Sequence, residues 1–211
     1  MPSFYEDSYN PDGTLRALTP THGAPATVKK SIVSDMNKCY YPDSFVVPFI
    51  DIVHDRAVEE IFRGCIRGCR FCQAGFIYRP IREKSVETIN RQSKALIDST
   101  GYDELSLCSL STSDHSCVNE MLTSLIDWTV RDKINLSLPS LRADNFSMSL
   151  MERLAKGGCA MIIIGDVPVA KSRFEKSLFD KKGFAFYQQI CETAHKYGCK
   201  VCAQLHQTDT D

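Results

Sequence analysis

Ala57-Val-Glu-Glu-Ile-Phe62 runs directly into Arg63-Gly-Cys65-Ile-Arg-Gly-Cys69-Arg-Phe-Cys72-Gln-Ala-Gly75. The first part predicts a short strand, and the second predicts a glycine-rich loop with the spacing Cys-x3-Cys-x2-Cys. Three thiolates can hold three irons of a cubane cluster and leave the fourth iron open for a small-molecule ligand. Because an open coordination position is typical of a catalytic metal site, the spacing predicts iron–sulfur chemistry at the end of this strand.

Two simpler interpretations of the three cysteines stay open. A structural zinc site usually has four ligands in paired Cys-x2–4-Cys clusters, and no second pair lies near this loop in the sequence. Cys199 and Cys202 do form a Cys-x2-Cys pair, but they fall in a predicted buried strand. The other interpretation is three reduced thiols that hold no metal.

Predicted strands and helices alternate downstream of the loop. The alternation predicts parallel strands with right-handed crossovers, and the apolar strand runs predict strands covered on both faces. Five parallel strands suit a partial βα (TIM-type) barrel, truncated, and a doubly wound open sheet is the alternative. In either fold, ligands gather at the C-terminal ends of the strands. The predicted strands are 57–62, 104–110, 134–138, 160–164 and 200–205, and the predicted helices are 86–99, 116–131, 147–156 and 184–197.

Composition limits the class of protein. The chain has 211 residues, is 43% hydrophobic and has a formal net charge of −1, so no overall field attracts nucleic acid, and none is expected as a partner. No run approaches the ~20 apolar residues of a membrane helix, and no N-terminal stretch resembles a signal peptide. We therefore expect a cytoplasmic protein with no membrane contact, in which ten cysteines favour metal or redox chemistry over disulfides.

Three segments are expected along the chain. Residues 1–48 are predicted to be an irregular lead-in, because Asn10-Pro-Asp-Gly13 is turn chemistry and prolines recur. Residues 49–156 form the cysteine-bearing core, and residues 157–211 continue the strand–helix alternation. An arginine cluster around the loop is either solvated or balances the charge of an anionic cluster and an anionic ligand. Its members are Arg63, Arg67, Arg70, Arg79 and Arg82.

Over about residues 1–156 the chain resembles the radical SAM superfamily, and more closely an uncharacterised bacterial family of cobalamin-domain-associated radical SAM proteins. The segments that carry the resemblance are 45–56, 63–78, 110–114 and 136–142. The resemblance implies a [4Fe-4S] cluster on Cys65, Cys69 and Cys72, with S-adenosylmethionine (SAM) on the open iron. It further implies reductive cleavage of SAM to a 5′-deoxyadenosyl radical that abstracts hydrogen from a substrate. An electron donor such as flavodoxin or ferredoxin is then required, and a cobalamin partner is implied by the family alone.

The same resemblance assigns roles to side chains around the cluster. Phe71 is expected to pack near the cluster or the adenine, with a place in the core as the alternative. Polar residues after the second and third strands are expected to contact SAM, with capping or loop solvation as the alternative. Those after the second strand are Ser109, Ser111, Thr112 and Asp114, and those after the third are Ser137, Ser140 and Arg142. The substrate, whether a small molecule or a macromolecule, is left unassigned.

Over about residues 153–211 the chain resembles the flavin-dependent old yellow enzyme family. The segments that carry this resemblance are Arg153-Leu-Ala-Lys-Gly-Gly-Cys-Ala-Met-Ile-Ile-Ile-Gly-Asp166 and His195-Lys-Tyr-Gly-Cys-Lys-Val-Cys-Ala-Gln-Leu205. This resemblance implies a contact between Gln204 and FMN. Because the chain ends at Asp211 without the closing elements of either barrel, a fusion or a truncation is expected. The alternative functions are therefore a fragment of an FMN-dependent NAD(P)H oxidoreductase and an inactive iron–sulfur-binding fusion.

Overall fold

Two units make up the chain, Met1–Ser34 and Asp35–Asp211. The computed structural model describes residues 4–139, 141, 148–159, 161–168, 178 and 180–206. Within these ranges, none of the helices combines the length and apolar character that crossing a membrane requires.

The first unit contains a β-hairpin. Strands β1 (Tyr5–Tyr9) and β2 (Leu15–Pro20) pair antiparallel, with Tyr5 opposite Pro20. The predicted turn joins them: Gly13 has a φ of 82°, and the Thr14 backbone N–H donates to Asp12 Oδ1 at 3.0 Å. The prediction that residues 1–48 are irregular is therefore wrong for the hairpin. Its strands are exposed along most of their length, so they lack the apolar alternation that marks a half-buried strand.

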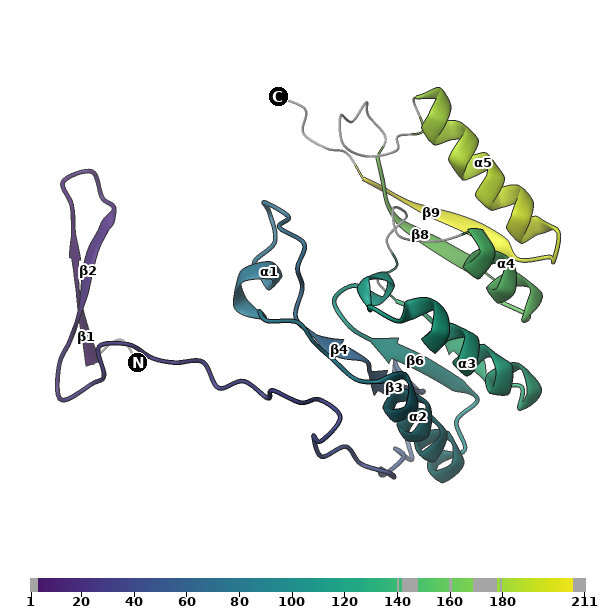
Figure 1. The fold of residues 1–211 in the computed structure, drawn as a ribbon, viewed down its shortest axis with the longest axis horizontal. Coiled ribbons are helices and arrows are strands. Elements are labelled where there is room, and N and C mark those ends of the chain that lie inside the picture. The colour runs from purple at the N-terminus through teal and green to yellow at the C-terminus, as the bar shows by residue number, and fades with distance from the viewer. Residues whose placement is uncertain are drawn as a thin grey trace. The chain divides into compact units, whose positions relative to one another are not determined.

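The second unit is built on five parallel strands in two sheets (Figure 1). In the first sheet, β6 (Glu104–Cys108) lies between β3 (Ala57–Glu60) and β7 (Asn135–Ser137). In the second, β8 (Met161–Pro168) pairs with β9 (Lys200–His206). All five strands were predicted, but no ladder joins β7 to β8 in the described ranges, and a partial barrel is not confirmed.

Four helices connect these strands, and each was also predicted. They are α2 (Val86–Thr100), α3 (Val118–Arg131), α4 (Met148–Lys156) and α5 (Lys181–His195). Local chemistry sets the ends of α2: the Ser85 side chain accepts a hydrogen bond from the Thr88 backbone N–H, and Gly101 ends the helix at a φ of 74°. Apolar side chains on one side of each helix form the core with the strands.

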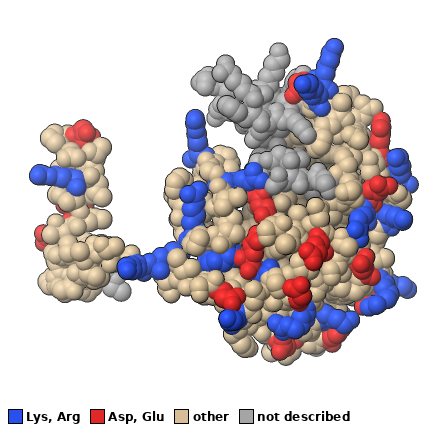
Figure 2. Space-filling view, in the orientation of Figure 1, with Lys and Arg blue, Asp and Glu red and all other residues tan. Residues whose placement is uncertain are grey.

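Among the described residues, β8 is covered on one face only, which corrects for this strand the prediction that both faces are buried. In β6 the prediction is confirmed, because the consecutive residues Leu105, Ser106 and Leu107 are all buried. In β8, Ile162 and Ile164 are buried against the helices, whereas Met161 is 50% exposed and Ile163 is 54% exposed. An unbroken apolar run therefore does not guarantee two covered faces, because residue type alone does not report which neighbours are present. Figure 2 shows acidic and basic side chains interspersed over the described surface of this unit on the side drawn.

A core substitution tests this packing. Leu122→Ala removes a fully buried side chain of α3 and should lower the free energy of unfolding by about 2–5 kcal/mol. Val130→Ala on the same helix, where the side chain is 48% exposed, should change it by about 0.5 kcal/mol or less. Urea denaturation followed by circular dichroism measures both, and equal losses would contradict the described core.

Candidate functional site

The cysteine loop is an excursion from the C-terminal end of β3. Strand β4 (Phe62–Arg63) leaves the sheet and β5 (Arg82–Glu83) returns, paired antiparallel with Phe62 opposite Glu83. The loop and the short helix α1 (Ala74–Ile77) lie between them and project from the stem (Figure 1). The Ile61 backbone N–H donates to the Cys108 carbonyl at 3.1 Å, so the stem starts where β6 also ends. The three cysteines thus lie at the strand edge where ligands bind in parallel sheets.

Two glycines allow close backbone contacts within the loop. Gly64 has a φ of 103°, and a Cβ there would lie 2.7 Å from the carbonyl oxygens of Tyr78 and Pro80. A Cβ on Gly75 would lie 2.6 Å from the Arg67 carbonyl oxygen. Both distances are shorter than real Cβ contacts, so only glycine fits. The beginning of the loop therefore packs directly against the residues that close it.

The donor set fits an iron–sulfur cluster. Cys65, Cys69 and Cys72 are half-buried free thiols. In the described part of the chain, no group of three or more Cys, His, Asp or Glu side chains is arranged to hold a single metal ion. In a cubane each cysteine binds a different iron, so its thiolates need not converge on one point. The cluster on these three cysteines stays a prediction, as does the zinc alternative.

Phe71 lies in this loop and is 89% exposed. The alternative that it belongs to the core is therefore wrong. Its predicted contact with the cluster or adenine stays a prediction.

Residues after β6 were predicted to contact SAM, and the structure shows that they differ in their hydrogen-bond partners. Ser109 Oγ and Thr112 Oγ1 lie 3.0 Å apart, and Thr112 Oγ1 donates to the Pro139 carbonyl at 2.7 Å. These two hydroxyls join the ends of β6 and β7, which supports the capping alternative. Ser111 Oγ is buried and has no hydrogen-bond partner in the described residues. Because an unsatisfied buried hydroxyl is costly, Ser111 is the member of this group that best fits a ligand contact.

Asp114 is paired with the cysteine loop itself. Its carboxylate accepts from Arg67 Nε at 2.8 Å, and Arg67 Nη2 donates to its second oxygen. Asp114 follows β6 on the short 3₁₀ helix η2 (Thr112–Asp114). The sequence placed Asp114 near SAM but gave no sign of this pair.

A cavity of about 700 Å³ brings together two predicted residues from different halves of the chain. Ser137 of β7 and Gln204 of β9 both line it, together with residues of β6, β8 and the loops between. Gln204 Oε1 lies 3.5 Å from where a Cβ on Gly165 would be, so this amide packs beside Gly165 at an ordinary van der Waals distance. Ser140 and Arg142, predicted to contact the SAM ribose or carboxylate, lie outside the described residues.

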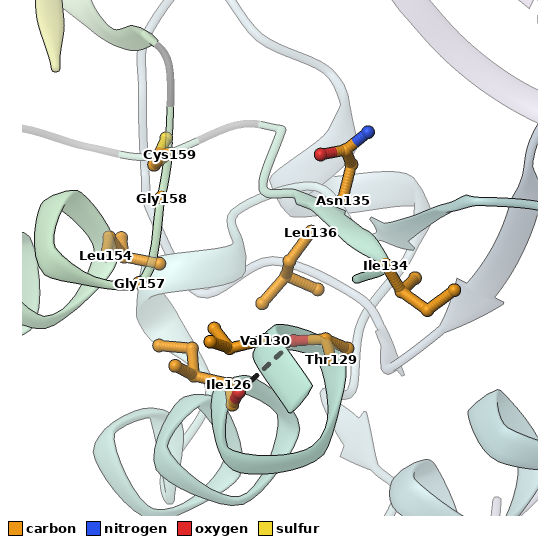
Figure 3. A pocket seen from close by; sticks show the side chains of 10 residues that line it. All are labelled: Ile126, Thr129, Val130, Ile134, Asn135, Leu136, Leu154, Gly157, Gly158 and Cys159. Atoms are coloured by element: carbon orange, nitrogen blue, oxygen red, sulfur yellow. Dashed lines mark hydrogen bonds between the residues drawn. The ribbon is translucent and has the colours of Figure 1, made fainter. Parts of the chain in front are cut away.

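A smaller pocket of about 80 Å³ lies between α3, β7 and the Gly157-Gly158 turn (Figure 3). Its lining is mostly apolar, including Ile126, Val130 and Leu154. Thr129 Oγ1 is satisfied within α3, where it donates to the Leu125 carbonyl at 2.8 Å. We interpret this pocket as a packing gap, because it lacks the converging polar groups of a ligand site.

A buried ion pair lies at the base of the cysteine excursion, and sequence patterns did not reveal it. Lys84 Nζ, just after β5, donates to Glu59 Oε1 at 2.7 Å and to Gln92 Oε1 at 2.8 Å. The ammonium lies 3.9 Å from the centroid of the Tyr41 ring. Burial raises the pKa of Glu59 to about 7, against the opposing effect of Lys84. Burial, followed by the Glu59 charge, also raises the pKa of Tyr41.

No model of a protein family matches the sequence. A bilirubin reductase from Clostridium symbiosum is 55% identical over 65 residues, which cover 29% of this chain and 17% of the reductase. An uncharacterized protein of Methanocaldococcus jannaschii is 26% identical over 152 residues, which cover 68% of this chain and 33% of that protein. The chain thus spans a third or less of the curated relatives that it matches.

Solved structures give a clearer likeness. The radical S-adenosylmethionine methyltransferase TsrM from Kitasatospora setae, with cobalamin and a [4Fe-4S] cluster bound, matches with a TM-score of 0.54 at 12% identity, over 71% of this chain and 30% of the methyltransferase. Its structure with tryptophan substrate and the SAM analog aza-SAM matches with a TM-score of 0.52, over 70% and 29%. Over the matched part, the fold of this chain is similar to that of the methyltransferase. None of these three proteins is described as a flavin protein, and the resemblance of residues 153–211 to the old yellow enzyme family stays a prediction.

The raised pKa of Glu59 makes the stability of the fold depend on pH. The folded state binds the Glu59 proton more tightly than the unfolded state does. The stability that this proton contributes is therefore complete below the ordinary pKa of 4.5 and is lost as pH rises through about 7. The unfolding free energy of the wild type minus that of Glu59→Gln should therefore fall over this interval, with a slope approaching about 1.4 kcal/mol per pH unit.

Denaturant titrations at half-unit pH steps measure this difference. Glu87→Gln is the control of opposite sign, because a hydrogen bond from its own backbone N–H lowers the pKa of Glu87. The stability contributed by Glu87 is therefore lost as pH falls. A flat difference for Glu59→Gln would contradict the buried, proton-binding carboxyl group.

Proposed function

We propose that this chain is the cluster-binding part of a radical SAM enzyme. In this proposal Cys65, Cys69 and Cys72 hold a [4Fe-4S] cluster, and SAM binds at the open iron. The observation that carries it is the placement of three free thiols on one glycine-closed loop at the C-terminal edge of a parallel sheet. The fold shared with a radical SAM methyltransferase over 71% of the chain supports the same conclusion.

The bound cluster and SAM supply one-electron reduction and a 5′-deoxyadenosyl radical, and the protein supplies binding and shielding. Ser111 is proposed to donate its hydroxyl to a polar group of SAM, because that hydroxyl is buried and has no partner in the part of the chain that the structure describes. Ser137 is proposed to contact the nucleoside from the wall of the 700 Å³ cavity. Phe71 is exposed beside the third cysteine and is proposed to cover the adenine or the cluster. Ser140 and Arg142 remain proposed SAM contacts from the resemblance alone.

The substrate stays open within this proposal. The matched methyltransferase is described with tryptophan and cobalamin, and these belong to that protein. For this chain we propose a cytoplasmic location and a flavodoxin or ferredoxin as electron donor. A cobalamin partner rests on the family resemblance.

Cysteine substitution tests the proposal. After anaerobic reconstitution with iron and sulfide, the wild type should hold about four irons per chain, and Cys69→Ala should lose most of them because one cubane corner has no ligand. Cys117→Ala, at an exposed thiol outside the loop, should keep them. Iron and sulfide analysis gives the content. EPR spectroscopy of the dithionite-reduced protein should show a cluster signal that changes when SAM is added.

Two outcomes would overturn the proposal. Equal iron content in Cys69→Ala and the wild type would place the metal elsewhere. A cluster signal indifferent to SAM would support an inactive iron–sulfur-binding fusion.

A second candidate function is a flavin-dependent reductase segment in residues 153–211. The segment and the flavin come from the sequence resemblance, and the observation that favours a reductase is the 55% identity with a bilirubin reductase over 65 residues of this chain, which are 17% of that protein. Gln204 lines the large cavity, where its amide is available to a planar ring.

Flavin binding tests this candidate. Purified protein should bind FMN with an absorbance band in the visible range, and Gln204→Ala should weaken binding about fivefold, the value of one hydrogen bond. Gln188→Ala is the control, because that amide is exposed on α5 and bonds only Glu192 among the interactions described. Binding unchanged in Gln204→Ala, or no binding at all, would remove the candidate.

A further inference from the structure

We propose that Asp114, His115 and Ser116 form a clamp that positions the cysteine loop, with Arg67 as its partner inside the loop. The three clamp residues follow β6. Asp114 bonds Arg67 within the cysteine loop, and His115 and Ser116 bond Lys84 and Glu83 at the base of the excursion. What the loop binds rests on the proposed function, but the clamp itself is argued from contacts within the protein.

The base of the excursion is held by two of the clamp residues. The Ser116 backbone N–H donates to Glu83 Oε1 at 2.9 Å, and the Ser116 hydroxyl donates to the other oxygen of Glu83. His115 Nε2 lies 3.1 Å from the Lys84 carbonyl oxygen. The Cys117 backbone N–H donates to His115 Nδ1 at 3.1 Å, so Nδ1 is the acceptor and Nε2 carries the proton given to Lys84.

This base is also anchored in the core. His115 is buried, and its ring centroid lies 6.1 Å from that of Phe62 on β4. The Lys84 side chain is held by Glu59 and Gln92. The carbonyl and the ammonium of Lys84 are therefore fixed by different elements, so the return strand has little freedom to move.

We call the segment Cys65–Cys69 the tip of the loop. Asp114 holds it through Arg67, which lies midway between these two cysteines. Both nitrogens that face the carboxylate are used, one for each oxygen, which is the bidentate geometry that fixes orientation. The Asp114 side chain is only 4% exposed and that of Arg67 is 30% exposed, so the pair is shielded from solvent. Arg67 is held through its backbone as well, because Gly75 packs against its carbonyl oxygen.

Arg63, a second arginine of the excursion, makes an ion pair that differs from the Arg67–Asp114 pair in reach and in exposure. Arg63 makes a bidentate pair with Glu60 at 2.7 and 2.8 Å, but these residues are three positions apart and the pair is more exposed. It joins neighbours on the stem and cannot restrain the tip. The Arg67–Asp114 pair joins residues 47 positions apart, so it fixes the tip of the loop relative to the sheet. Asp114 is accordingly assigned to positioning the loop, in place of the SAM contact that the sequence suggested.

Hydrogen exchange of the apoprotein tests the clamp without any cofactor. The excursion amides that donate hydrogen bonds, those of Cys72, Phe76, Ile77 and Tyr78, should exchange about tenfold or more faster in Asp114→Asn than in the wild type, because the loop opens when its tip is released. Glu60→Gln is the matched control and should leave this exchange unchanged. Arg67→Gln removes the same pair from the more exposed side and covers the case in which Asp114→Asn fails to fold. Equal protection of the loop in Arg67→Gln and the wild type would overturn the clamp.

Two measurements on reconstituted protein separate positioning from a general loss of stability. Cluster loss to a chelator should be about tenfold faster in Asp114→Asn, and the EPR signal of the reduced cluster should broaden. Asp114→Glu keeps the charge and should restore most of both values. A wild type that binds no cluster but shows the expected exchange pattern would overturn the proposed function and leave the clamp intact. A wild type that binds the cluster, together with variants whose loop exchange equals that of the wild type, would overturn the clamp and leave the proposed function intact.

Discussion

The ammonium group of Lys84 is buried, and the need to compensate its charge joins three elements at one point. Glu59 of β3 and Gln92 of α2 supply oxygens, and the Tyr41 ring faces the charge. A pair of this kind adds little net stability compared with apolar packing, but removal of one partner leaves a buried charge at large cost. Its effect is therefore specificity: the chain can close here only if the strand that returns from the cysteine loop ends beside β3.

The cysteine excursion depends on that closure. Its stem is only a short antiparallel pair, which by itself holds a loop weakly. The Lys84 anchor fixes one end, and the segment after β6 supplies bonds at the base and the tip. Two glycines allow the backbone to pack on itself. The thiols are thus presented by a restrained loop, as a cluster with an open coordination site requires.

Polar side chains gather near the ends of the strands and around the large cavity. Ser111 is buried after β6, and Ser137 and Gln204 line the cavity. The fold shared with a radical SAM methyltransferase places the same parallel architecture in an enzyme described with a [4Fe-4S] cluster. Since this chain spans 30% of that enzyme, its activity remains a proposal, and no substrate is assigned to it.

Sequence patterns were sufficient for the five parallel strands, for helices α2 to α5 and for the location of the cysteine loop, because periodicity, the Ser85 cap and the Gly101 turn act within a few residues. They did not predict α1, the β4–β5 pair or η2. They missed the hairpin at residues 5–20, whose exposed strands carry no apolar alternation. They could not show that Ser109 is bonded to Thr112 while Ser111 Oγ has no partner among the described residues, or that Asp114 pairs with Arg67. Which face of each strand is open, and which charges are buried together, required the folded chain, because such contacts join residues 25 to 47 positions apart and no local pattern encodes them.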